Sequence, residues 1–233
     1  MAELVLVHGS GQNASSWGRV AARLREGGHT VATPDLPKTE AHWALRDHAE
    51  VIAAAAVGPA PVIVAHSFSG VFLPLVADLR TCGALIYFAA VIPAPGQSIR
   101  AQFEADATMF NPAWIEAGKR WFEPDETEGL AREFLFHDCD AETLAWGLTT
   151  MEFYDTRPLV TEASPAAAPA GVRTAAIVAS QDRTIDPDWG RRMARQLLGV
   201  EAIELDAGHC PHVSRAAETT DLLARLAMTD DGA

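Results

Sequence analysis

The chain has 233 residues and a formal net charge of −13, because 18 Lys and Arg stand against 31 Asp and Glu. Such an acidic surface repels phosphate backbones and anionic lipid, so we expect neither a nucleic acid nor a membrane as partner. Hydrophobic residues make up 48% and charged residues 21% of the sequence, as is typical of a folded protein rather than a disordered one. At this length we expect one core with a sizeable insertion.

The three cysteines, Cys82, Cys139 and Cys210, are odd in number and widely separated, so neither a disulfide framework nor a zinc site is predicted. His137 stands beside Asp138, but no second His or Cys follows at ligand spacing, and we expect no metal or cofactor. We find no signal-peptide pattern, and the longest apolar run, residues 84–92, is too short to span a bilayer. A reduced, cytoplasmic setting is therefore expected.

Six short runs of β-branched and apolar residues predict strands. In chain order they cover residues 4–7, 30–33, 61–65, 84–90, 173–179 and 200–205. Such near-continuous apolar strands are typical of a parallel sheet that is buried on both faces.

Helical patterns lie between these runs. The first follows Ser15 or Ser16, which we expect as its N-cap, and stops at Gly27-Gly28. The others are expected at residues 39–57, after Ser67, at 187–198 and at 214–228. Alternating strands and helices predict the α/β class, with a doubly wound, mostly parallel six-stranded sheet.

The alternation breaks between residues 93 and 170. Proline-rich runs open and close this segment, which contains 10 of the 17 aromatic residues in the chain. We therefore predict a core formed by residues 1–92 and 171–233, with residues 93–170 as a helical cap. An apolar lid over a binding site is the favoured interpretation, and a small helical core of its own is the alternative.

The strongest local motif is a buried strand that runs into Ala65-His66-Ser67-Phe68-Ser69 and then a helix. This pattern is typical of a nucleophile elbow, where a serine sits on a strained turn and residues two positions away must be small. Ala65 and Ser69 satisfy that requirement, although an ordinary turn remains the alternative. Ser69 fits worse as nucleophile, because the β-branched Val71 would be its flank.

Two further motifs complete a family pattern. The first strand leads into His8-Gly9-Ser10, and a late strand leads into Gly208-His209. With the Ser67 turn and the segment 181–185, they resemble the α/β-hydrolase superfamily, over the whole chain outside the insertion. The branch most similar to them is that of plant methyl esterases and hydroxynitrile lyases, with its bacterial esterase relatives. This resemblance implies an α/β-hydrolase core that lacks the first strands and carries a helical cap.

The resemblance also implies a catalytic triad in the chain order Ser, acid, His. Ser67 would be the nucleophile, Asp182 the acid and His209 the base, with the backbone N–H groups of Ser10 and Phe68 as oxyanion hole. Asp182 is favoured by the family spacing. The competing acids are Asp186, Asp188 and Asp206.

Other residues near these motifs receive lesser roles. His8 orders the oxyanion loop in the family, and His66 is expected to be structural. His212 is expected at the start of the last helix. The predicted substrate pocket contains Gly9, His66, Trp121, Phe136, Trp146 and Cys210.

The expected function is hydrolysis of a carboxylic ester with apolar or aromatic groups, and the expected partner is a small-molecule ester. Lyase members of the branch carry Thr after the first-strand His and Lys after the late His, where this chain has Gly9 and Cys210. Esterase is therefore favoured over lyase. A cofactor-independent dioxygenase and a catalytically silent receptor remain alternatives, and a homodimer is compatible with the sequence.

Overall fold

The computed structural model describes residues 1–37, 43–118, 120–121, 123, 125–153, 156–164 and 170–228. Six strands form one sheet in the order β2-β1-β3-β4-β5-β6, and every pair of neighbours runs parallel. The strands are β1 (Glu3–Val7), β2 (Thr30–Ala32), β3 (Val62–Ser67), β4 (Ala84–Ala90), β5 (Thr174–Ala179) and β6 (Ile203–Leu205). This topology confirms the predicted fold class.

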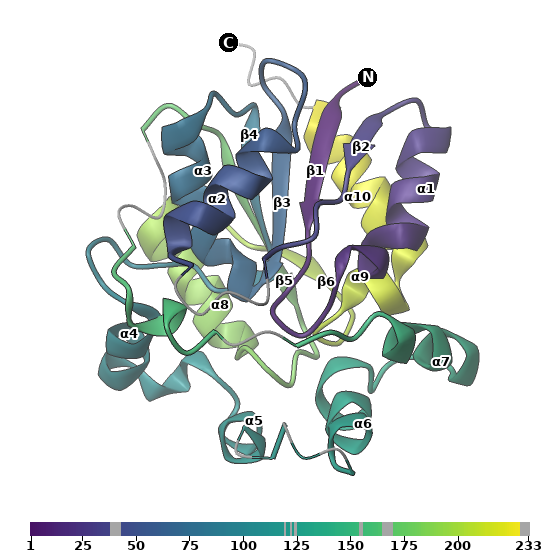
Figure 1. Cartoon of the computed structure of the whole chain (residues 1–233), viewed down its shortest axis with the longest axis vertical. Coiled ribbons are helices and arrows are strands. Elements are labelled where there is room, and N and C mark those ends of the chain that lie inside the picture. The colour runs from purple at the N-terminus through teal and green to yellow at the C-terminus, as the bar shows by residue number, and fades with distance from the viewer. Residues whose placement is uncertain are drawn as a thin grey trace.

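The two faces of the sheet alternate residue by residue along each strand, as a pleated strand requires. In β1, for example, Val5 and Val7 belong to one buried cluster, whereas Leu4 and Leu6 belong to another. The first face is covered by α2 (Leu45–Ala54), α3 (Leu73–Leu79) and α8 (Pro187–Met193), and the second by α1 (Gly18–Glu26) and α10 (Ala216–Met228) (Figure 1). Helices therefore bury both faces of the sheet.

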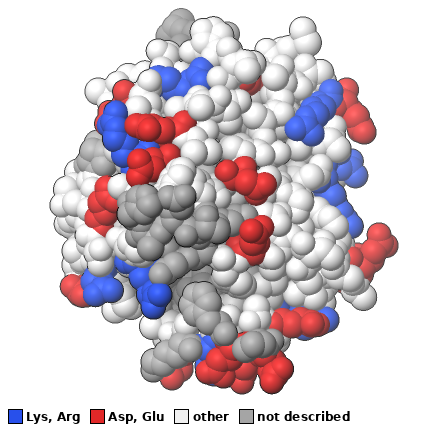
Figure 2. Space-filling view, viewed as in Figure 1, with Lys and Arg blue, Asp and Glu red and all other residues white. Residues whose placement is uncertain are grey.

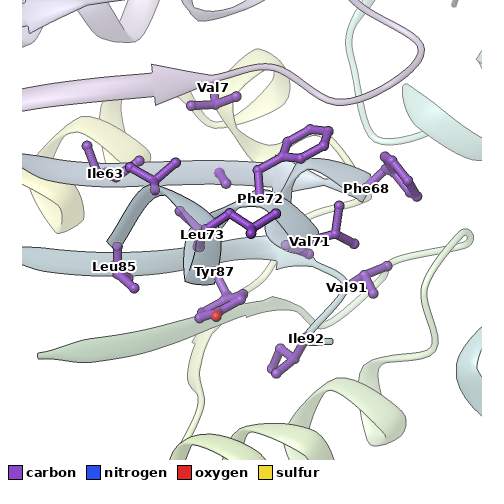
Figure 3. Close-up of a cluster of buried hydrophobic side chains, with 14 of the residues drawn as sticks. Val7, Ile63, Phe68, Val71, Phe72, Leu73, Leu85, Tyr87, Val91 and Ile92 are labelled. Atoms are coloured by element: carbon purple, nitrogen blue, oxygen red, sulfur yellow. The ribbon is translucent and has the colours of Figure 1, made fainter. Parts of the chain in front are cut away.

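The first cluster lies under the helix that follows β3. Figure 3 shows Phe72 and Leu73 in one group of side chains with Ile63 of β3 and Tyr87 of β4. All four side chains are at most 1% exposed. Burial of apolar side chains of this size stabilises the fold by about 1.5–3 kcal/mol each, so this cluster anchors the turn between β3 and the following helix.

Two predicted helix starts are wrong. The first helical segment is a 3-10 turn, Ala14–Trp17, which continues into α1. Its N-cap is Asn13, whose side chain accepts from the Ser15 N–H, and not Ser15 or Ser16. Helix α2 begins at Leu45 and is shorter than predicted. Ala44 is its N-cap, and the Asp47 carboxylate accepts from the Ala44 N–H. Predicted helical positions 39–42 lie outside the described residues.

Between residues 93 and 170 the described chain forms helices and short turns. The helices are α4 (Ile99–Ala105), α5 (Pro112–Ala117), α6 (Thr127–Leu130) and α7 (Ala141–Thr149). They lie beyond the carboxyl ends of the strands, away from the two termini (Figure 1). Ile99 packs into the cluster that contains Phe68, whereas Trp121 packs into a cluster with Cys210. The division of the chain into core and cap stays a prediction; Phe122, Tyr154 and residues 165–169 of the segment lie outside the described residues.

The surface carries many of the acidic residues. On the face shown in Figure 2, acidic side chains gather along the lower edge, where Figure 1 places α5 and α6. Within the described part of the chain, no helix is both long and apolar enough to cross a membrane.

Gly70 supports a sharp prediction about stability. A Cβ at this position would lie 2.1 Å from the carbonyl oxygen of Val91, so Gly70→Ala must push two backbone segments apart. We expect the free energy of unfolding to fall by about 1–3 kcal/mol, as in other overpacked cores. Gly18→Ala is the matched control, because nothing lies within 4 Å of its Cβ position, and it should change stability by less than about 1 kcal/mol. Urea unfolding midpoints measure both, and equal midpoints would contradict the close approach.

Candidate active site

Ser67 ends β3 in a strained conformation. Its φ is 57° and its ψ is −128°, a left-handed region that non-glycine residues rarely adopt. The pairing of β3 with β4 shifts at this point, so that Ser67 lies opposite Ala90 instead of Ala89. The strand thus turns sharply into the 3-10 helix Phe68–Phe72. This turn leaves the serine hydroxyl at the carboxyl edge of the sheet.

The structure brings the three predicted triad side chains together. His209 Nε2 lies 2.9 Å from Ser67 Oγ, and His209 Nδ1 lies 2.7 Å from Asp182 Oδ2. The other oxygen of Asp182 accepts from the N–H groups of Thr184 and Ile185, at 2.7 and 3.1 Å. A ring whose Nδ1–H donates to the carboxylate leaves Nε2 as the acceptor for the serine hydroxyl. This arrangement can take a proton from Ser67.

The competing acids are engaged elsewhere. Asp186 caps α8 by accepting from the Trp189 N–H. Asp188 pairs with Arg191, and Asp206 accepts from the side chain of Gln181. In these contacts none of the three accepts from His209.

Two backbone N–H groups next to the serine lack acceptors among the described residues. Phe68 is the first residue of its 3-10 helix, so its N–H has no acceptor inside that helix. The N–H of Ser10 also forms no backbone hydrogen bond to a described residue. Ser10, Ser67 and Phe68 line the same cavity, so these donors are suited to an oxyanion.

The loop after β1 is held by side chains around it. His8 Nε2 accepts from the Leu36 N–H at 3.1 Å, which leaves its Nδ1–H to donate to the Gly9 carbonyl at 2.8 Å. Ser69, fully buried, donates its hydroxyl to the His8 carbonyl at 2.6 Å. Ser69 therefore fastens the loop to the turn, and its hydroxyl is not presented to a cavity.

Two further buried histidines surround the site. His66 donates from Nε2 to the His209 carbonyl at 2.9 Å, and burial lowers its pKa well below the usual value. His212 donates from Nε2 to Gln12 Oε1 at 3.2 Å and stacks on Trp17. Burial, with His209 and His8 nearby, lowers the pKa of His212 to about 3. Both rings are therefore neutral near pH 7.

Cys210 follows His209 directly and is 1% exposed. Burial raises the pKa of its thiol well above the usual value, with Cys139 and Asp182 adding to the effect. A thiol that stays protonated is a poor nucleophile.

Two cavities meet at the serine. The first has a volume of about 190 Å³ and includes His209, whereas the second has a volume of about 290 Å³ and does not. The second is lined mainly by apolar side chains, whereas the first combines aromatic side chains with polar ones, and the two share Ser10, Ser67, Trp114 and Thr156. Ser67 therefore faces space on two sides, as an enzyme that divides its substrate at this point would need.

Four of the predicted pocket residues, Gly9, His66, Trp121 and Cys210, line the first cavity. Phe136 and Trp146 are not among the residues that line these two cavities, and their role in a substrate pocket stays a prediction. Phe136 is 1% exposed and packs against Gly147, while the ring of Trp146 lies 4.3 Å below the Arg19 guanidinium. The aromatic content of residues 93–170 pointed to a pocket wall, but only the fold decides which rings form it. The cavity residues that sequence reasoning missed include Trp114, Phe153, Phe103, Phe110 and Gln12.

No group of three or more His, Cys, Asp or Glu side chains in the described ranges is arranged to hold a metal ion. His137, the candidate considered from the sequence, donates from Nε2 to the carbonyl of Gln181 at 2.9 Å.

A serine on a strained turn, a histidine and a buried carboxylate in one hydrogen-bonded chain are typical of serine hydrolases. Residues 4–222 match the model of the Alpha/beta hydrolase family, and the chain belongs to this family. It is 28% identical to the Probable esterase PIR7A of Oryza sativa subsp. indica over 97% of both chains. It is 23% identical to Methylesterase 7 of Arabidopsis thaliana, over 97% of this chain and 96% of that one. These relatives confirm the predicted plant esterase branch.

Solved structures show the same fold. A crystal structure of polyneuridine aldehyde esterase matches with a TM-score of 0.74 at 18% identity, covering 97% of this chain and 99% of that one. A pyrethroid hydrolase from Sphingobium faniae JZ-2 matches with a TM-score of 0.72 at 19% identity over 97% of each chain.

The neutral histidines predict how stability depends on pH. Below about pH 6.5, His66 and His212 become protonated in the unfolded chain but stay neutral in the folded chain. The free energy of unfolding therefore falls as the pH falls. Each histidine contributes about 1.4 kcal/mol per pH unit in this window. Urea unfolding of His212→Gln between pH 5 and pH 7 should show a smaller decrease than the unsubstituted chain, by about 2 kcal/mol. An identical decrease in both proteins would contradict the depressed pKa.

Proposed function

We propose that Ser67, His209 and Asp182 hydrolyse a carboxylic ester of small to medium size, with apolar or aromatic groups, through an acyl-enzyme. The observation that carries this proposal is the hydrogen-bonded chain from Ser67 Oγ through His209 to Asp182, with both contacts shorter than 3 Å. The class of enzyme follows from the family and from the esterases among its relatives: the chain is a carboxylic ester hydrolase.

The geometry supports a two-step reaction. His209 Nε2 takes the proton of Ser67 as its oxygen attacks the ester carbonyl, and then gives that proton to the leaving alcohol. Asp182 holds the ring by its Nδ1 and stabilises the imidazolium that forms. The N–H groups of Ser10 and Phe68 donate to the developing oxyanion. Water then attacks the acyl-enzyme by the same route.

The surroundings of Gly9 bear on the lyase alternative. A Cβ at this position would lie 2.9 Å from both His66 Nδ1 and Ser67 Cβ, so the Thr of lyase members does not fit without a shift. Cys210 occupies the place of their Lys and supplies no positive charge for a cyanide ion. Both observations favour hydrolysis.

Ser67→Ala and His209→Ala should each lower kcat by about 10⁴- to 10⁶-fold, because each removes a group that acts in the transition state. Asp182→Asn should lower kcat by about 10⁴-fold through the wrong tautomer of His209. Asp206→Asn, the control among the competing acids, should keep a rate close to that of the unsubstituted enzyme. The rates are measured on a panel of short-chain, long-chain and aryl esters.

A fluorophosphonate probe tests the nucleophile directly. Mass spectrometry should find the covalent label on Ser67 in the unsubstituted enzyme and none at this position in Ser67→Ala. An unlabelled protein that still binds small apolar ligands would instead support the receptor alternative.

A further inference from the structure

The two cavities differ in their relation to the base, because His209 is among the lining residues of the first and not of the second. The leaving alcohol must receive its proton from His209 Nε2, so the alcohol side of the substrate faces the cavity that His209 lines. The acyl group then extends into the other cavity. Phe68, whose N–H is one of the two expected oxyanion donors, lines that cavity.

The acyl-side cavity has an apolar wall with one charged side chain. Its wall includes Ile99, Phe103, Phe110 and Val160, and among the described residues that line either cavity only Arg100 carries a formal charge. Arg100 is exposed to solvent, so the cavity reaches the surface beside it.

Arg100 has no counter-ion in the part of the chain that the structure describes. Within the described ranges its guanidinium forms no ion pair or hydrogen bond, whereas Arg191 pairs with Glu204 and Arg192 with Asp106. A guanidinium in the lining of an apolar cavity suits a carboxylate, which it can bind through two parallel hydrogen bonds.

We propose that the acyl group carries a second, free carboxylate at its far end, so that the substrate class is the half-ester of an apolar dicarboxylic acid. This inference rests on the proposed function and specifies its acyl side. Hydrolysis would consume one water and release the dicarboxylate and the alcohol. Because Arg100 is exposed, its contribution to kcat/KM should be modest, about two- to fivefold.

The test compares methyl esters that differ only at the far end of the acyl chain. Monomethyl esters of dicarboxylic acids with four to eight carbons are paired with the methyl alkanoates of equal length, and kcat/KM is measured by methanol release. At the chain length that reaches Arg100, the ratio of half-ester to alkanoate should fall two- to fivefold in Arg100→Gln and less in Arg100→Lys. Arg46→Gln, on the exposed face of α2, is the control and should leave the ratio unchanged.

The outcomes separate the two proposals. The enzyme could hydrolyse the alkanoates while Arg100→Gln leaves the ratio of kcat/KM for half-ester to alkanoate unchanged at every chain length. The proposed carboxylate site would then be wrong, and the proposed esterase activity would be unaffected. If neither series is hydrolysed, the proposed function fails and the carboxylate site fails with it.

A separate observation concerns the segment between α6 and α7. His137 and Asp138 touch the backbone immediately before two of the triad residues. His137 Nε2–H donates to the carbonyl of Gln181, the residue before Asp182, at 2.9 Å. Asp138 Oδ2 accepts from the N–H of Gly208, the residue before His209, at 2.9 Å, and its side chain is 4% exposed.

Gly208 is what allows this close approach. A Cβ there would lie 2.7 Å from Asp138 Oδ1 and 2.8 Å from His137 Nε2, so any other residue would push the segment away. Arg215 also holds Asp138, because its Nη1 donates to the backbone carbonyl of Asp138 at 3.3 Å and lies 3.7 Å from Asp138 Oδ2. The carboxylate of Asp138 is thus held by a backbone N–H and by a guanidinium.

We infer that His137 and Asp138 are positioning residues. They hold the loop that carries Asp182 and the loop that carries His209 in fixed positions relative to each other. The hydrogen bonds of His209 to Asp182 and Ser67 are 2.7 and 2.9 Å long, so a displacement of either loop by about 1 Å would break them. The segment before α7 makes the hydrogen bonds to Gln181 and Gly208. The alignment of the triad therefore depends on the position of that segment.

The experiment separates positioning from packing. Asp138→Ala should lower kcat for a small acetate ester by about 10- to 100-fold with KM changed less than about twofold, and should slow fluorophosphonate labelling of Ser67 in parallel. Asp138→Asn keeps an oxygen acceptor for Gly208 and should restore most of the rate. Glu142→Ala, exposed in the first turn of α7, is the control and should leave kcat unchanged.

A second pair of variants covers the case in which Asp138→Ala does not fold. His137→Phe should lower kcat in the same way, and His137→Gln, which keeps a donor for the Gln181 carbonyl, should restore it. Variants that raise KM for bulky esters or lower the unfolding midpoint, with kcat and labelling unchanged, would show that the contact serves packing alone and would overturn the inference.

Discussion

The site depends on a strained backbone turn at Ser67 that the surrounding structure keeps in place. The turn is held from two directions: Gly70 lies against the carbonyl of Val91, and Ser69 donates to the carbonyl of His8. Strain of this kind costs about 1–3 kcal/mol and persists only where neighbouring contacts enforce it. The same contacts bring the loop after β1 beside the serine, so the nucleophile and the oxyanion donors are positioned together.

Four buried histidines lie near this turn, and their partners give them different chemistry. His209 has a carboxylate on Nδ1 and a hydroxyl on Nε2, so it can move a proton. His66 and His8 hold backbone groups, and His212 holds the side chain of Gln12. Burial keeps His66 and His212 neutral, and a neutral ring adds no positive charge next to His209. Asp182 is therefore the charged partner of the base, and the rings of His66 and His212 add no charge beside it.

The segment that interrupts the α/β alternation serves the site in two ways. Trp114 contributes to the walls of both cavities, so this segment shapes the space around Ser67. Through His137 and Asp138 it also contacts the loops that carry the acid and the base. Substrate space and triad alignment are therefore linked by one piece of chain.

The α/β class, the six strands and the approximate position of Ser67 could be predicted from the sequence, because local patterns of apolar residues and small residues encode them. The choice of Asp182 needed the family spacing, since Asp186, Asp188 and Asp206 are equally acidic in isolation. Only the tertiary structure decided which acid meets His209, because that contact joins residues from different loops across the edge of the sheet. It also decided that Trp114 faces the cavities while Phe136 and Trp146 do not, since aromatic side chains in an irregular segment carry no periodic signal for the direction in which they point.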